Sequence, residues 1–189
     1  MSVPRIAALL VGGICFFVAL APGASAATIT RSFAPSADSY VSSSLPTTNY
    51  GASSVVRESA SGDIRRGYMR FVVSGLTGTV SGVSLRVRAE TAHTSGFTVR
   101  RVTNTTWGET TITNSNAPTI SSTIAGSSGA VTAGTYVTVP LTGIATANGT
   151  FSIGIRAAGS STAVLDLASR ETATPPLLQI TRPTPSRRR

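Results

Sequence analysis

Short runs of alternating apolar and polar residues follow one another from about residue 27 to residue 182, separated by Gly, Asn, Pro and Ser. Alternation with a period of two is typical of strands that bury one face, and no amphipathic helical stretch accompanies it. Regularly spaced short strands of this kind predict an all-β, antiparallel sandwich or barrel. The polar, low-complexity segment 121–134 is expected to be a long loop. The expected strands are 27–35, 39–43, 54–59, 67–74, 83–90, 97–103, 135–141, 151–157, 163–169 and 177–183.

The first 26 residues predict a secretory signal peptide. One positive charge, Arg5, precedes an apolar run of 16 residues, and the segment ends in the small-x-small pattern of residues 24–26. A spanning helix needs roughly 20 apolar residues, which argues against a membrane anchor. Cleavage after Ala26 predicts a secreted, extracellular protein without a membrane segment, and the remaining 163 residues suit one monomeric domain over 27–182. Residues 183–189, which end in three arginines, are expected to form a basic, solvated tail.

The composition limits which partners the protein can bind and which chemical groups it can use. The chain has 16 basic residues, all of them arginine, against 7 acidic ones. This balance favours anionic partners such as acidic polysaccharides, anionic surfaces or extracellular DNA. The only cysteine, Cys15, lies in the expected signal peptide, and His93 is the only histidine, so thiol chemistry and a multi-histidine metal site are excluded.

Alternation assigns faces to the strands. If Met69 and Phe71 in the run 67–74 are buried, then Tyr68, Arg70 and Val72 point outward. The same reasoning in the later runs places an arginine on the outward side of each strand, where neighbouring strands lie about 4.8 Å apart. One basic stripe is therefore expected, although solvated surface arginines are the ordinary alternative. The expected core residues are Phe33, Phe71, Leu85, Val99, Ile153 and Ile155. The expected outward residues are Tyr68, Arg70, Arg86, Arg88, Arg100 and Arg156.

An ordered set of motifs runs from Phe33 to Thr181 and includes "RGYMRFVVSGL", "SLRVRAE" and "GTYVTVPLT". Its most specific part is Trp107 with Glu109, Ile112, Asn116 and Pro118, followed by the segment 169–171 before two prolines. This ordered set resembles the DNRLRE domain, also called carbohydrate-binding module family 96. The sequence departs from the family at Asn114 and Leu167, where relatives often carry an aromatic residue.

The resemblance implies a jelly-roll β-sandwich in a secreted protein that binds polysaccharide, with acidic glycans such as alginate as one ligand class, and it implies no catalysis. The outward set then predicts a ligand site in which arginines bind uronate carboxylates and Tyr68 stacks on a sugar ring. Nothing in the sequence suggests an enzyme, since it has no second histidine, nucleophile elbow or phosphate-binding loop. A cell-surface or matrix adhesion domain is the alternative, and no specific nucleic-acid partner is expected.

The sequence allows two interpretations each for Trp107 and Glu109. Trp107 is expected to pin a loop to the sandwich, although stacking on sugar is the alternative. Glu109 with Arg170 or Glu171 predicts either an ion pair or part of a calcium site. No cofactor is expected, and the scattered carboxylates leave room for a structural calcium ion without identifying its ligands.

Overall fold

The computed structural model describes residues 27–184, and within them the chain forms eleven strands and no helix. The expected signal peptide and residues 185–189 of the expected tail lie outside the described residues. No helix in residues 27–184 is long and apolar enough to span a membrane. The strands are β1 Thr28–Phe33, β2 Pro35–Ser42, β3 Val55–Glu58, β4 Arg65–Val73, β5 Gly82–Arg88, β6 Phe97–Val102, β7 Ile120–Ser127, β8 Tyr136–Pro140, β9 Gly149–Ala157, β10 Leu165–Ala168 and β11 Leu177–Pro183.

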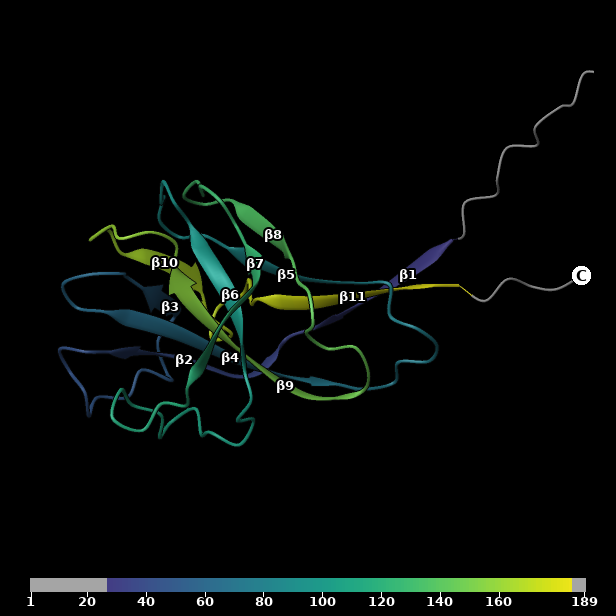
Figure 1. Ribbon diagram of the computed structural model, residues 1–189, viewed down its shortest axis with the longest axis horizontal. Coiled ribbons are helices and arrows are strands. Elements are labelled where there is room, and N and C mark those ends of the chain that lie inside the picture. Colours follow the sequence, from purple (N-terminus) through teal and green to yellow (C-terminus); the bar gives the residue numbers. More distant parts are fainter. Residues whose placement is uncertain (1–26, 185–189) are drawn as a thin grey trace, which may run out of the picture.

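The strands form two main sheets packed as a sandwich (Figure 1). The four-stranded sheet has the order β1-β11-β5-β8, and the five-stranded sheet has the order β2-β4-β9-β6-β7. A short pair, β3 with β10, completes the fold, and every pairing is antiparallel. β1 and β11 run side by side out of the body of the sandwich, where the described chain begins and ends (Figure 1). The expected all-β, antiparallel sandwich is confirmed, and its strand order is consistent with a jelly roll.

The first half of one expected loop is a strand, and residues 128–134 are irregular as expected. Segment 121–134 was expected to be irregular, but Ile120–Ser127 forms β7 at the edge of the five-stranded sheet. Its register against β6 shifts on both sides of Arg100. Glycine and serine weaken the alternation of this segment, so pairing with β6 rather than local pattern makes it a strand.

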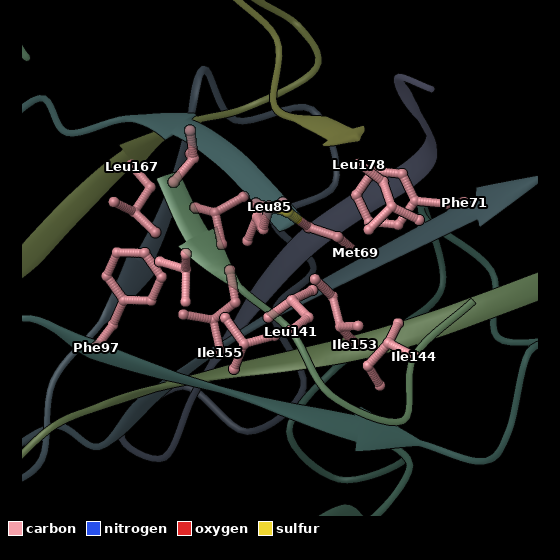
Figure 2. Packing of buried hydrophobic residues seen from close by; sticks show 14 of the residues in the cluster. Met69, Phe71, Leu85, Phe97, Leu141, Ile144, Ile153, Ile155, Leu167 and Leu178 are labelled. Atoms are coloured by element: carbon pink, nitrogen blue, oxygen red, sulfur yellow. The ribbon is translucent and has the colours of Figure 1, made fainter. Parts of the chain in front are cut away.

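The core lies between the two main sheets, and Figure 2 shows side chains from both of them meeting there. Met69 and Phe71 of β4 and Ile153 and Ile155 of β9 face Leu85 of the four-stranded sheet, and all five are fully buried. The inward faces predicted by alternation are therefore correct for these strands. Of the six expected core residues only Phe33 is partly exposed, and it packs against the edge of the core.

A second apolar cluster covers part of the outer face of the five-stranded sheet. The loop 103–119 folds over this face, so that Trp107 and Ile112 pack on Tyr68 and Val102. Tyr68 has no exposed surface, and its hydroxyl donates to the Pro118 carbonyl oxygen at 3.0 Å. The expectation that Tyr68 is available for a sugar ring is therefore wrong. Alternation placed it on the correct face, but the loop buries that face.

Candidate functional site

The six expected ligand residues do not form one stripe. Arg70, Arg100 and Arg156 lie on the five-stranded sheet, whereas Arg86 and Arg88 lie on β5 of the four-stranded sheet. The two sheets pack face to face across the core, so their outward sides point in opposite directions (Figure 1). The prediction of a single stripe is wrong because β5 pairs with β8 and β11 instead of with β4, β6 or β9.

Trp107 has a structural position. Only 6% of its surface is exposed, its Nε1 donates to Ser152 Oγ at 3.1 Å, and its ring meets that of Tyr68 edge-on at 6.1 Å. Arg70 holds the same loop from outside, because its Nη1 donates to the Trp107 carbonyl oxygen and its guanidinium lies 5.3 Å from the indole centroid. The expectation that Trp107 pins a loop is confirmed, and Arg70 contributes to the same attachment.

Beside the loop 103–119, the uncovered half of the five-stranded sheet carries a groove of about 510 Å³. We call it the arginine groove because four arginines line it, together with Thr98, Ile64, Ile124 and the small residues Ser59, Ala60, Ala157, Ala158 and Gly159. No acidic or aromatic side chain lines it within residues 27–184. The four arginines are Arg65, Arg66, Arg100 and Arg156.

Two of these arginines were missed by the sequence reasoning. Arg65 and Arg66 precede the run 67–74, and the structure extends β4 to include them. Alternation could have found Arg66, since it is two residues from Tyr68 and shares its face. Arg65 alternates to the other face, and only its position at the strand end brings it to the groove.

The groove arginines carry mostly uncompensated charge. The ion pairs in the described part of the chain include Arg65, whose Nη2 lies 2.8 Å from Asp63 Oδ2, but not Arg66, Arg100 or Arg156. Hydrogen bonds to neutral side chains position Arg66 and Arg100. Arg66 Nη2 donates to Asn114 Oδ1, and Arg100 Nε donates to Thr98 Oγ1 at 3.2 Å.

Tyr68 lies beneath the loop 103–119, beside the groove, and does not neutralise the charge of the groove arginines. Burial raises the pKa of its phenol, although the charges of Arg66 and Arg156 act to lower it. The phenol therefore keeps its proton at neutral pH, and the positive charge remains available to a ligand.

The two positions that depart from the family differ in environment. Leu167 is fully buried in the core, so an aromatic residue there would change packing. Asn114 instead accepts the hydrogen bond from Arg66, which lines the groove. The departure at Asn114 thus bears on the site, whereas the one at Leu167 bears on packing.

On the opposite side of the sandwich, Arg86 and Arg88 have partners of their own. The Arg86 guanidinium lies 3.5 Å from the ring centroid of Tyr136, and Arg88 forms an ion pair with Glu90. This surface is separate from the arginine groove.

The family-specific acids form an ion-pair network. Glu109 Oε2 lies 2.7 Å from Arg170 Nη1, and Glu109 Oε1 accepts the backbone N–H of Asp38 at 2.8 Å. Asp38 Oδ2 accepts the backbone N–H of Arg170 at 2.7 Å. Burial raises the pKa of Asp38 to about 7, although the Arg170 N–H acts to lower it. Residues 27–184 contain no group of three or more His, Cys, Asp or Glu that could hold a metal ion, so of the two roles left open for Glu109 the structure shows the ion pair.

The described part of the chain is thus an antiparallel β-sandwich with an arginine-lined groove on the outer side of one sheet. The sequence model of carbohydrate-binding module family 96 matches residues 29–182, and the chain belongs to this family. No curated protein matches the chain.

Proposed function

We propose that this protein is a secreted, monomeric, non-catalytic module that binds an acidic, uronate-rich polysaccharide in the arginine groove. The observation that carries the proposal is the convergence of four arginines on one groove without an acidic lining residue in the described part of the chain. Family membership supports a carbohydrate as the ligand.

Charge and size both favour this ligand. A guanidinium binds a carboxylate through two parallel hydrogen bonds, which gives orientation as well as affinity. The groove volume of about 510 Å³ falls within the range of about 300–1,000 Å³ that is typical of ligand sites. Since no aromatic ring lines the groove within residues 27–184, the arginines must supply most of the recognition. Screening by salt should therefore weaken binding strongly.

The lining also supports binding without cleavage. Hydrolysis of a glycosidic bond ordinarily needs a pair of carboxyl groups on either side of the bond. The groove has no carboxyl side chain among the described residues, and Asp63 is held by Arg65 at its rim.

Calorimetry tests the proposal with polyuronate and a neutral glucan, each at low and at physiological salt. We expect binding of the polyuronate alone, weakened by salt. Arg66→Gln and Arg156→Gln should each weaken it by about 1–3 kcal/mol, the usual value of a hydrogen bond to a charged group. Arg86→Gln is the matched control, because it removes the same charge from the opposite side of the sandwich. Equal binding of the glucan, or full binding by both groove variants, would contradict the proposal.

Export is tested separately. The pattern of residues 1–26 supports removal of a signal peptide. Mass spectrometry of the exported protein should find an N-terminus near Ala27. Recovery of the full-length chain in the membrane fraction would overturn this part of the proposal.

A further inference from the structure

A second hollow lies on the other side of β7 from the arginine groove. It has a volume of about 240 Å³. Ile124 lines both the hollow and the groove, and half of its surface is exposed. The two hollows therefore meet at a single exposed side chain on an edge strand. The residues that line the second hollow are Arg101, Ser121, Thr123, Ile124, Ala125, Thr142, Gly143 and Ile144.

Arg101 is the charged residue of this second hollow. Alternation in β6 turns Arg101 to the same side of the sheet as Val99, which faces the core, yet Arg101 is exposed. Arg101 pairs with the buried Ile153 of β9, and the register of β6 against β9 is continuous through Arg100, Arg101 and Val102. Alternation therefore turns the two consecutive arginines to opposite sides of the sheet, where they line two different hollows. The ion pairs of residues 27–184 do not include Arg101.

The rest of the lining suits a sugar unit. Ser121, Thr123 and Thr142 carry hydroxyl groups, and the half-exposed Ile124 offers apolar surface to the C–H groups of a pyranose ring. Arg100 fastens β7 at this point, because its guanidinium donates to the carbonyl oxygens of Ser121 and Ser122.

We infer that the Arg101 hollow is a second anion subsite of the same binding site, so that an acidic polysaccharide crosses the edge strand β7 at Ile124 and occupies both hollows. The inference rests on the proposed function and adds to it the form of the ligand. The site takes an extended stretch of a polyanionic chain, with one carboxylate at the groove arginines and another at Arg101. A single sugar or a very short oligomer fills the arginine groove alone.

The test is the dependence of affinity on ligand length. Calorimetry would compare uronate oligosaccharides from the dimer to the octamer. For the unmodified protein we expect affinity to rise about tenfold once the oligomer is long enough to reach Arg101. Arg101→Gln should remove this rise without changing the affinity for the dimer. Arg156→Gln should weaken binding at every length. Arg86→Gln should change neither the affinity for the dimer nor the rise of affinity with length.

A second variant fills the hollow without removing charge. Thr123 is exposed and lines the hollow, so Thr123→Trp should also abolish the rise with length. Circular dichroism and thermal melting would establish that each variant is folded.

The outcomes separate the two proposals. If the unmodified protein binds uronates but Arg101→Gln retains the full dependence on length, the second subsite is overturned and the arginine groove stands. If affinity does not change from dimer to octamer, the second subsite is likewise overturned. If no uronate of any length binds, the proposed function fails and the subsite fails with it.

Discussion

Glu109 and Arg170 meet at 2.7 Å although 61 positions separate them in the chain. The contact joins the loop 103–119 to the segment that follows β10, and Glu109 also accepts the backbone N–H of Asp38 from β2. One carboxylate thus connects three distant segments. The loop that buries Tyr68 and borders the arginine groove is held at this point and at Trp107.

We expect Glu109→Gln to lower the free energy of unfolding by about 1–3 kcal/mol, because it removes a charged acceptor from two hydrogen bonds. The ion pair itself should account for only a small part of this loss, because the Arg170 side chain is 34% exposed and water screens its charge. Urea unfolding measures the change. Arg170→Gln and the double variant complete a cycle, and strictly additive effects would show that the two side chains are not coupled.

Buried carboxyl groups predict an unusual dependence of stability on pH. The pKa of Asp38 is raised from 3.8 to about 7, and burial also raises the pKa of Glu58 well above its usual range. A raised folded pKa means that the folded state holds the proton more tightly than the unfolded state. The stabilisation is complete below the unfolded pKa and is lost as the pH rises through the folded pKa. Since one pKa unit is worth about 1.4 kcal/mol, we expect the free energy of unfolding to fall by about 2–4 kcal/mol from pH 4 to pH 7.

Two variants test whether Asp38 and Glu58 cause this pH dependence. Asp38→Asn keeps an acceptor for the Arg170 N–H and cannot ionise, so it should flatten much of the slope, and Glu58→Gln should remove a further part. Glu90→Gln is the control, because this side chain pairs with Arg88 and its charge does not contribute to the raised pKa of Asp38 or Glu58. Denaturant unfolding at each pH measures the slope. A protein that grows more stable from pH 4 to pH 7 would show that both carboxyl groups are ionised in the fold.

Tyr68→Phe distinguishes a structural tyrosine from a ligand residue. The variant removes the hydrogen bond to the Pro118 carbonyl oxygen and keeps the buried ring, so it should cost about 0.5–1.5 kcal/mol of stability. Binding of polyuronate should not change, because the side chain has no exposed surface. Thermal melting measures the loss of stability, and calorimetry on the same preparation measures the affinity for polyuronate. A large loss of affinity with unchanged melting would mean that the loop 103–119 opens to expose Tyr68.

Gly154 of β9 leaves room for the Ile120 side chain of β7, although β6 lies between these two strands. A Cβ atom at this position would lie 2.5 Å from Ile120 Cγ1, so Gly154→Ala should destabilise the protein by about 1–3 kcal/mol through overpacking. Adding Ile120→Ala should recover part of that loss by making room for the new methyl group. Gly82→Ala is the control, since its nearest neighbour would be Thr181 Cβ at an ordinary 3.8 Å. Urea unfolding of the parent protein and the three variants measures these changes, and a Gly154→Ala protein as stable as the parent would contradict this packing.

The sequence by itself determined what depends on local pattern. A period of two is visible within one strand, so alternation identified every strand except β7, the fold class and the inward faces of β4, β5 and β9. The family motifs pointed to Trp107, Glu109 and Arg170, which the structure shows to be attachment points of the loop 103–119 and the segment after β10.

Only the tertiary structure decided what depends on which segments become neighbours. Placing β5 in the other sheet separated Arg86 and Arg88 from the groove, and folding of the loop 103–119 over the sheet buried Tyr68. Extension of β4 brought Arg65 and Arg66 to the groove, and the packing of β7 and the segment 142–144 around Arg101 formed the second hollow. Alternation says on which side of its own strand a residue lies. It carries no information about which strand lies alongside or what covers that side, because both are set by contacts between residues far apart in the chain.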